Sequence, residues 1–464
     1  MSLDGLLTAS DTVDGAQRAD RATLEARVAT VAGGLLALGV GRGDFVTWQA
    51  PNRLETVVAY RACWRVGAVA APVHHLAGTA DADRMLAGLD ARPLDLDALP
   101  AGDPVARGSL AQDDDAAVVL FTSGSSGAPK GVIHTQRGLA YKATLMAEVH
   151  GLRADDAVLM PAPLAHISGL LNGVLLPGVV PMKSVLMARW DPEEALTLIE
   201  RERITFMIGP PTFFVSLMDA PGFRPERVET LRLVSSGGAG VTPAFVDEAA
   251  ARLGCVVKRT YGSTEAPTIT TSQPGDDPAR ARDTDGRPTG TVELRLDATT
   301  GELQVRGPEL FSGYTDPAAD VDAFTNDGWF RTGDLATIDG AGWLTIVGRI
   351  KDIIIRGGEN IAAAEVESVL EAHPAVRQAV AVGEPDARLG ERVVAFVVTD
   401  GPFDLEACRS WFAAQGTARY KTPERVVVVA ALPLLAAGKP DRAALRNSIL
   451  ASTTSYIQTP LTPE

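Results

Sequence analysis

The sequence predicts an α/β fold: a large N-terminal domain of α/β layers with a small β unit, then a small α+β C-terminal domain. Its 464 residues exceed what one hydrophobic core normally holds, so we expect at least two domains. Up to about residue 290, short apolar runs alternate with helical segments, a pattern typical of βαβ units around largely parallel sheets. After that point strands of alternating polarity dominate, which predicts a small antiparallel unit.

The alternation can be followed along the first part of the chain. Residues 24–39 have the apolar spacing of a helix, and residues 44–50 read as a strand. A second helix is expected to open at Pro51, because proline suits a first helical turn. An acid-started helix is predicted at Asp191–Arg203. The other short apolar runs are predicted strands, within 156–164, 184–190, 204–211, 231–240 and 256–263.

The later part of the chain predicts the β unit and the second domain. Two strands joined by a turn at Thr299–Gly301 are expected within 290–314. The segment 342–361 follows. After it we expect a helix at 362–373 and strands at 377–386 and 391–399. We place the boundary so that the domains are 1–348 and 349–464, and expect the polar tail 451–464 to fray and its last residues to be disordered.

Composition narrows the functional classes. A net charge of −15 and a pI near 5.0 argue against a nucleic-acid partner, since such proteins usually carry a basic patch. No stretch predicts a membrane span or a signal peptide. The cysteines, Cys63, Cys255 and Cys408, are scattered and predict neither a zinc site nor a disulfide framework. We therefore expect a cytoplasmic enzyme.

The stretch TSGSSGAPKG, residues 122–131, follows a buried apolar run. Glycines let the backbone close around an anion, hydroxyl groups donate to phosphate oxygens, and Lys130 adds a positive charge. A Walker A loop is excluded because Pro129 and Gly131 flank the lysine. The alternative is a solvent-exposed linker, which seldom follows a buried strand and ends in Pro-Lys-Gly. The stretch therefore predicts a phosphate-binding loop of another kind.

This loop resembles the signature of the adenylate-forming superfamily, which comprises acyl-CoA synthetases, non-ribosomal peptide adenylation domains and beetle luciferases. Other stretches resemble its remaining motifs, in family order: PAPLAHISGL (161–170), RTYGSTE (259–265), GWFRTGDL (328–335), VGRIKDIIIRGGENI (347–361) and LPLLAAGKPDRAAL (432–445). The resemblance spans about residues 24–447. Alone, Glu265 would suit a helix start, Asp334 a turn and Lys439 a solvated surface; together and in order they indicate the family's acyl-CoA synthetase branch.

The resemblance implies an ATP site. Lys439, Glu265, Lys130 and Thr264 are the implied catalytic residues, and Glu265 is the implied Mg²⁺ ligand. Tyr261 is expected against adenine, and Asp334 and Arg349 near the ribose. The full implied ATP and AMP set is Thr122, Ser123, Gly124, Ser125, Ser126, Gly127, Lys130, Gly238, Ala239, Tyr261, Gly262, Ser263, Thr264, Asp334, Arg349 and Lys439.

The acid and its acceptor follow from other segments. The implied acid-binding residues are His166, Gly238, Gly262 and Pro267. Residues 161–181 contain no acidic side chain to hold an ammonium group, so we expect an uncharged aliphatic, alicyclic or aromatic carboxylic acid.

The acceptor is expected to be coenzyme A. The implied CoA-binding residues are Gly357, Gly358, Glu359 and Lys421, and Lys351 is the implied hinge between the domains. Ala362-Ala363 stands where the family usually has Tyr-Pro or Ser-Pro, a departure from the CoA-ligase pattern. A solvated lysine before a strand is an equally good explanation of Lys421.

The segment between residues 76 and 121 is about half as long as in family members, so we expect a trimmed N-terminal subdomain. Because of this shortening, the sequence does not predict which residues form the far wall of the acyl pocket or the surface of a homodimer. Next to it lie His74 and His75, which strand alternation predicts on opposite faces and to which we assign no role.

Other functions stay open at this point. The acceptor could be an acyl carrier protein, which presents the same thiol arm as CoA. An adenylate-binding or thioester-forming relative without the first half-reaction and, more distantly, a P-loop ATPase are further alternatives.

Overall fold

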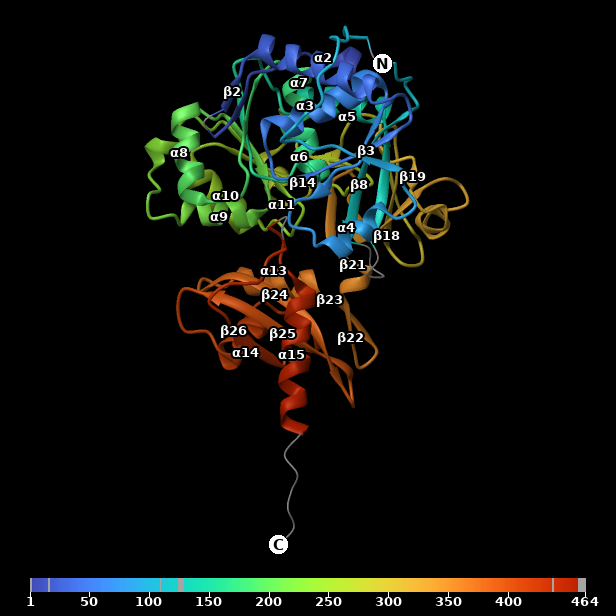
Figure 1. The fold of residues 1–464 in the computed structure, drawn as a ribbon. Helices are drawn as coiled ribbons and strands as arrows, with labels where there is room; N and C mark the ends of the chain where they lie inside the picture. The colour runs from blue at the N-terminus through green and yellow to red at the C-terminus, as the bar shows by residue number, and fades with distance from the viewer. Residues whose placement is uncertain (1, 16, 109, 124–128, 436–437, 458–464) are drawn as a thin grey trace.

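The computed structural model describes residues 2–15, 17–108, 110–123, 129–435 and 438–457. Figure 1 shows a large domain, coloured blue to gold, above a small domain, coloured orange to red, with helix α15 (Arg442–Ile457) running away from the large domain. The mixed α/β class predicted from the alternation of strands and helices is confirmed.

A long sheet forms one half of the large domain, in the order β16-β15-β14-β13-β12-β10-β11-β1-β2. The pairs from β1 through β14 are parallel, except β1 with β2, as βαβ alternation requires. Its strands are β1 (Thr12–Asp14), β2 (Gln17–Ala19), β10 (Ala157–Met160), β11 (Lys183–Leu186), β12 (Phe206–Gly209), β13 (Leu233–Gly237), β14 (Val256–Tyr261), β15 (Thr270–Thr271) and β16 (Arg287–Pro288).

A second sheet has the order β19-β9-β8-β5-β3-β7, with β4 (Gln49–Ala50) and β6 (Val73–His74) pairing beside it. It comprises β3 (Phe45–Thr47), β5 (Val69–Ala70), β7 (Ala91–Pro93), β8 (Ala116–Ser123), β9 (Pro129–Thr135) and β19 (Gly313–Tyr314). An antiparallel sheet of β17 (Glu293–Leu296), β18 (Glu302–Arg306), β20 (Phe330–Ile338) and β21 (Leu344–Arg349) is the predicted small β unit, and the predicted turn joins β17 to β18.

Helices pack around these sheets. They are α1 (Leu3–Leu6), α2 (Arg21–Ala37), α3 (Leu54–Val66), α4 (Thr79–Leu86), α5 (Gln136–Val149), α6 (Ile167–Leu170), α7 (Leu176–Val179), α8 (Pro192–Glu202), α9 (Pro211–Met218), α10 (Pro243–Leu253), α11 (Pro278–Asp283) and α12 (Asp320–Ala323). Trp64 on α3 and Phe214 on α9 are fully buried in two separate apolar cores. The first core joins residues of both sheets, such as Met160 of β10 and Val118 of β8, and the second contains the alternate residue Leu159 of β10, so the two cores cover opposite faces of the long sheet. Among the described residues no helix is both long and apolar enough to cross a bilayer.

The small domain is built on an antiparallel sheet with one parallel edge. Its strands are β22 (Ile353–Arg356), β23 (Glu359–Ala362), β24 (Val376–Asp386), β25 (Gly390–Thr399) and β26 (Arg425–Val428), and its helices α13 (Ala363–Glu371), α14 (Leu405–Ala414) and α15. A separate apolar core including Phe412 and Leu370 holds α13 and α14 on this sheet. Such an independent core suits a unit that moves as a body.

The structure corrects several expectations. The second helix begins at Leu54, not Pro51, because Arg53 is extended and the Asn52 side chain bonds to Met160 O, Ala162 O and Leu164 N. Helix α15 continues to Ile457, so residues 451–457 of the tail expected to fray are helical. Residues 458–464 lie outside the described part, and the expectation for these last residues stays a prediction.

The pair of neighbouring histidines is a further correction. The rings of His74 and His75 stack, with centroids 4.6 Å apart, instead of pointing to opposite faces. Strand β6 ends at His74, so His75 already belongs to a turn and strand alternation no longer applies.

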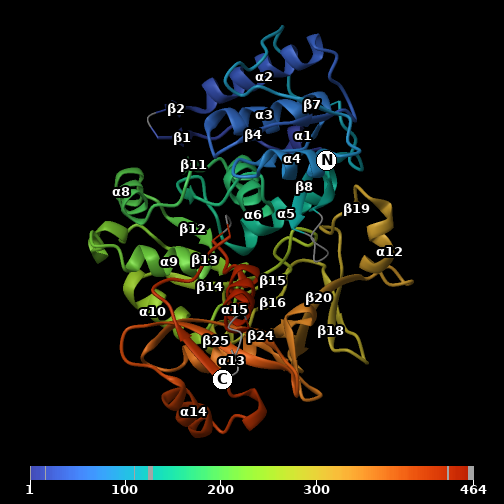
Figure 2. The same cartoon turned by 60° about the horizontal axis from the view of Figure 1, so that its bottom comes forward.

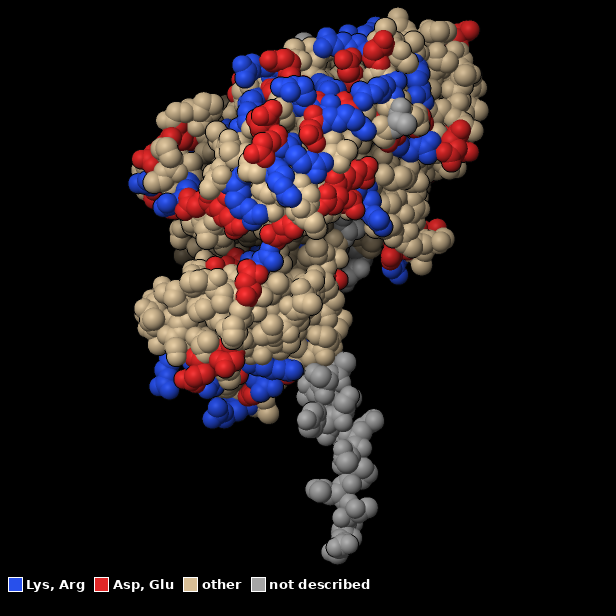
Figure 3. All heavy atoms as spheres, turned by 90° about the vertical axis from the view of Figure 1, so that its left-hand side faces the viewer, with Lys and Arg blue, Asp and Glu red and all other residues tan. Residues whose placement is uncertain are grey.

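Charged side chains are unevenly spread over the surface. On the face shown in Figure 3, Lys, Arg, Asp and Glu intersperse over the large domain, whereas the small domain carries its charges mainly at the end away from it. Between the domains, Arg377 of β24 forms an ion pair with Asp219, the residue after α9. This pair is one of the contacts that fix how the domains sit against each other.

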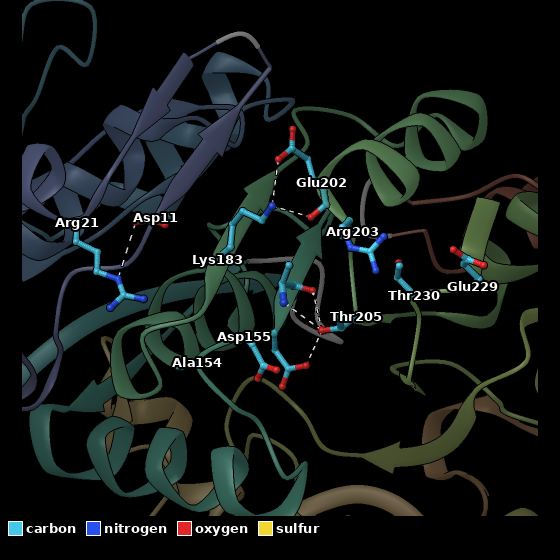
Figure 4. Close-up of a pocket in the computed structure, with 12 residues that line it drawn as sticks. Asp11, Arg21, Ala154, Asp155, Lys183, Glu202, Arg203, Thr205, Glu229 and Thr230 are labelled. Atoms are coloured by element: carbon cyan, nitrogen blue, oxygen red, sulfur yellow. Dashed lines mark hydrogen bonds and ion pairs between the residues drawn. The ribbon is translucent and has the colours of Figure 1, made fainter. Parts of the chain in front are cut away.

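A polar cavity of about 800 Å³ opens at the amino ends of β10, β11 and β12 (Figure 4). Several of its polar side chains bind one another: Lys183 Nζ donates to Glu202, and the Thr205 hydroxyl donates to Asp156. Ligands of open α/β sheets bind at the opposite, carboxyl ends of the strands. We therefore assign this cavity to structure rather than to catalysis.

Glu202 gives this region an acid sensitivity. Burial alone would raise the pKa of its carboxyl, but hydrogen bonds from Arg18, Arg201 and Lys183 outweigh burial and lower the pKa to about 2. The folded-state pKa lies below the unfolded value, so this stabilisation is present above about pH 4.5 and is lost as the pH falls toward 2.

We predict that Glu202→Gln flattens the pH dependence of the unfolding free energy over this interval. Urea denaturation at several pH values between 5 and 3 measures it. The matched control is Glu248→Gln, which removes an exposed partner of Arg252 and should leave the slope unchanged. An unchanged slope in Glu202→Gln would contradict the assignment.

Candidate active site

The sequence motifs converge at the carboxyl ends of the parallel strands. Strands β10, β12, β13 and β14 run in the same direction, so the segments that follow them meet at one edge of the sheet. In Figure 2 the red chain that precedes α15 leaves the small domain and reaches toward this same edge. The site is therefore closed from below by the small domain.

Tyr261, Asp334 and Arg349 lie together on one side of the site. The Tyr261 hydroxyl donates to Asp334 Oδ2 (2.6 Å), and Arg349 Nε donates to Asp334 Oδ1 (2.6 Å). The β20–β21 register places Asp334 opposite Arg349, and Tyr261 arrives as the last residue of β14. Burial, reinforced by Asp334, raises the pKa of Tyr261, which keeps its hydroxyl protonated. Asp334 is thus a fixed, 2% exposed acceptor at this end of the site.

Lys130, Tyr314 and Glu265 lie together at the other end. The Tyr314 hydroxyl donates to Glu265 Oε1 (2.9 Å), and Lys130 Nζ lies 4.7 Å from the centre of the Tyr314 ring. Tyr314 reaches this position because β19 pairs with β9, the strand that carries Lys130. Nothing in the sequence marked Tyr314, since its partners are distant along the chain.

The loop between β8 and β9 is described at its two ends. Thr122 stands opposite Lys130 and Ser123 opposite Pro129 in the antiparallel register, so β8 and β9 pair up to the ends that flank this stretch. Its predicted phosphate-binding residues Gly124, Ser125, Ser126 and Gly127 lie outside the described residues.

Buried side chains hold the Thr264–Thr268 segment in place. His134 Nε2 donates to Thr264 O (2.7 Å), and Lys142 Nζ donates to Thr268 O (2.8 Å). Both His134 and Lys142 are fully buried, and Lys142 is paired with buried Glu309 (3.0 Å). Thr268 has φ +43°, a strained conformation for a β-branched residue, which persists only where its surroundings impose it. Sequence reasoning missed both positioning residues, since neither sits in a motif.

The motif's smaller residues have structural duties as well. A Cβ on Gly262 would approach Thr268 N to 2.3 Å, so only glycine fits where the chain folds back on itself. The Ser263 hydroxyl oxygen accepts a hydrogen bond from Ala266 N (3.1 Å), and Pro267 is buried beside it. These contacts shape the turn that presents Thr264 and Glu265.

Lys439 enters the site from the small domain. Its Cε and Nζ would lie 3.2 and 3.6 Å from a Cβ placed on Gly238, which itself has φ +77° just after β13. The loop is docked by a hydrogen bond from the Thr212 hydroxyl to Gly438 O (2.7 Å). Gly438 also has no room for a side chain against Phe213. Ala239, another predicted ATP-binding residue, follows Gly238 in the same turn, and no contact among the described residues gives it a role.

The charges around Lys439 link the two ends of the site. Reduced hydration lowers the pKa of its ammonium group; the positive charges of Arg349 and Lys351 add to this, and Asp334 and Glu265 oppose it. Lys439 is therefore within electrostatic reach of the Tyr261 end and of the Glu265 end. A ligand spanning both ends would pass its ammonium group.

His166 lies beside this centre, immediately before α6. Burial, together with the charges of His74 and Lys439, lowers the pKa of its imidazole to about 4, so the ring is neutral at pH 7. The segment around it, residues 161–165, is buried and apolar, as expected for an acyl pocket.

The predicted CoA residues lie on the small domain. Gly357 (φ +60°) and Gly358 (φ +89°) form the turn between β22 and β23, followed by exposed Glu359. Lys421 pairs with Glu365 of α13 (2.5 Å) rather than pointing freely into solvent. Lys351 lies in the short segment between β21 and β22, where the chain passes from one domain to the other.

Comparison with known proteins decides the family. The sequence profile described as AMP-binding enzyme matches residues 8–94 and 88–315, and the profile of the AMP-binding enzyme C-terminal domain matches residues 365–439. The chain belongs to the AMP-binding enzymes. The two profiles confirm the predicted superfamily with its large and small domains, and the CoA-ligase relatives described next confirm the acyl-CoA synthetase branch.

Several curated relatives of this AMP-binding enzyme are CoA ligases. The medium-chain fatty-acid–CoA ligase of Escherichia coli is 33% identical, over 94% of this chain and 86% of that protein. The feruloyl-CoA synthase of Amycolatopsis sp is 33% identical, over 90% of this chain and 91% of that protein.

A solved relative offers two states for comparison. ATP-bound MatB from Rhodopseudomonas palustris superposes with a TM-score of 0.87 at 27% identity, covering 97% of this chain and 99% of that one. Apo MatB covers the same shares with a TM-score of 0.79. The AMP-binding enzyme described here is thus more similar in overall arrangement to the ATP-bound form.

We predict that Tyr314→Phe lowers acid-dependent pyrophosphate release about tenfold, because Glu265 loses the hydrogen bond that orients it while the ring facing Lys130 stays. Tyr314→Leu, which also removes the ring, should lower it further. The measurement is kcat for pyrophosphate release with each variant's melting temperature as a folding control. Wild-type rates in Tyr314→Phe would show that Glu265 needs no such support.

Proposed function

We propose that this chain is an AMP-forming acyl-CoA synthetase. In the first half-reaction a carboxylate oxygen of the acid attacks the α-phosphorus of ATP, and pyrophosphate leaves. In the second, the thiolate of CoA attacks the acyl carbon, and AMP leaves with the bonding electrons. The observation that carries the proposal is Lys439 lying against Gly238, within electrostatic reach of Asp334, the carboxylate suited to the ribose, and of Glu265 at the phosphate-suited end.

The positions of the site residues suit one orientation of ATP, with adenosine at the Tyr261 end and the terminal phosphates at the Lys130 end. The adenosine would lie by Tyr261, with the ribose hydroxyls donating to the remaining lone pairs of Asp334. The β- and γ-phosphates would lie toward Lys130 and the hairpin loop. The α-phosphate then falls beside Thr264 and Lys439, where the ammonium group offsets the repulsion between the attacking carboxylate and the phosphate.

Mg²⁺ fits this arrangement through Glu265. Mg²⁺ in ATP sites takes one or two protein carboxylates together with phosphate oxygens and water. Glu265 offers a carboxylate whose Oε1 is already oriented by Tyr314. When bound, the ion supplies positive charge against the pyrophosphate leaving group.

The acid and acceptor complete the proposal. The apolar segment at 161–165 with neutral His166 supports an uncharged aliphatic, alicyclic or aromatic acid. CoA would use Gly357, Gly358, Glu359 and Lys421 after the small domain turns about Lys351, and the similarity to ATP-bound MatB supports the present arrangement as the adenylating one. A carrier protein is the alternative acceptor. We further propose that the enzyme is cytoplasmic and forms a homodimer.

The direct test is pyrophosphate release from ATP and Mg²⁺ over a panel of carboxylic acids, with and without CoA. CoA-dependent formation of AMP with some acid is the expected result. Release of pyrophosphate without CoA-dependent formation of AMP would indicate that the acceptor is a carrier protein. No release with any acid would overturn it.

The role of Lys439 has a separate test. We predict that Lys439→Ala loses pyrophosphate release by at least about a hundredfold, since charge and orientation at the α-phosphate are lost together. It should still convert a supplied acyl-adenylate and CoA to the thioester. Lys421→Ala serves as the matched change on the opposite half-reaction. Equal loss of both half-reactions in Lys439→Ala would refute the assignment.

A further inference from the structure

His74, His75 and His166 gather beside the acyl-binding segment. The rings of His74 and His166 have centroids 5.1 Å apart, and those of His74 and His75 are 4.6 Å apart. His166 in turn feels the charge of Lys439, so His74 lies one side chain beyond the reacting centre. The family resemblance gave a role to His166 and none to His74.

The backbone that presents His74 is held firmly. Gln49 Nε2 donates to His74 O (3.1 Å) and to Ala77 O (2.7 Å), closing the turn that follows β6. Gln49 belongs to β4, which pairs with β6 in parallel register. The position of the His74 backbone is therefore set by the fold.

The hydrogen bonds of His74 define its tautomer. Leu76 N donates to His74 Nδ1 (3.1 Å), so the neutral ring carries its proton on Nε2. Nε2 is enclosed, and among the described residues it has no hydrogen-bond partner. Enclosing a donor without a partner is unfavourable, and such groups in native proteins usually await a ligand or a water molecule.

The charge state of the cluster limits what His74 can bind. Burial, with a contribution from His75, lowers the pKa of His74 to about 4, so at pH 7 it is a neutral donor. His75 and His166 are its ring neighbours and also have lowered pKa values. The nearest cation at the centre, Lys439, is needed by the reacting carboxylate. An uncharged oxygen acceptor suits this setting better than a second carboxylate.

We propose that the acid carries an uncharged acceptor oxygen on its acyl part, a ketone, hydroxyl or ether oxygen, and that His74 Nε2–H donates to it. This inference rests on the proposed function and names a substrate class within it. A site built to hydrogen-bond such a group discriminates against an analogue that lacks it, because the enclosed donor is then left unpaired.

Matched pairs of acids test the inference: 5-oxohexanoate with hexanoate, 4-oxocyclohexanecarboxylate with cyclohexanecarboxylate, and 3-(4-hydroxyphenyl)propanoate with 3-phenylpropanoate. The measurement is kcat/KM for acid-dependent pyrophosphate release. We expect wild type to prefer the oxygen-bearing member of at least one pair by about tenfold or more. His74→Phe should abolish the preference and spare the deoxy acid, and His74→Gln, which keeps a donor, should retain part of it. His75→Phe is the matched control and should keep the preference.

The outcomes separate this inference from the proposed function. Turnover of several acids without discrimination within any pair would overturn the inference alone. Equal loss with both members of a pair in His74→Phe, and no rescue in His74→Gln, would assign His74 to structure and also overturn it. No pyrophosphate release with any acid would overturn both proposals together.

Discussion

The account depends on one contact between the domains: the docking of the loop that carries Lys439 onto the carboxyl edge of the large sheet. Thr212 fixes the loop through Gly438 O, and Phe213 leaves room there for a glycine only. With the loop so placed, the lysine side chain lies against Gly238. Without this contact the cluster around Asp334 and the cluster around Glu265 remain in the large domain. The ammonium group that offsets the charge of an attacking carboxylate is then absent from between them.

The small domain carries the lysine as part of a rigid unit. Arg442, three residues after Lys439, donates to Glu367 of α13 (2.8 Å) and to Ala381 O of β24 (2.9 Å). It also lies 3.8 Å from Asp352, which follows Lys351, the proposed hinge residue. A turn about the hinge would therefore withdraw Lys439 together with α13 and could bring the Gly357–Gly358 turn to the site. One domain can thus serve both half-reactions in succession.

Sequence alone could predict what depends on local pattern. The strand and helix alternation, the β17–β18 hairpin and the motif segments that meet at the site could be read from residue types and spacing. The positions of Tyr314, His134 and Lys142 could not, because each acts on a partner more than a hundred residues away or, for Tyr314, across a sheet pairing. Strand alternation misplaced His75, since β6 ends one residue too early for it to apply.

Cross-linking the domains tests the central claim most directly. Asp219→Cys and Arg377→Cys would replace the interdomain ion pair with a pair of thiols for a short bismaleimide, with Cys255 changed to Ala because it is partly exposed. The account predicts that the linked protein still gives one burst of acyl-adenylate and pyrophosphate but no CoA-dependent turnover, while the unlinked variant turns over. Sustained CoA-dependent turnover by fully linked protein would contradict it.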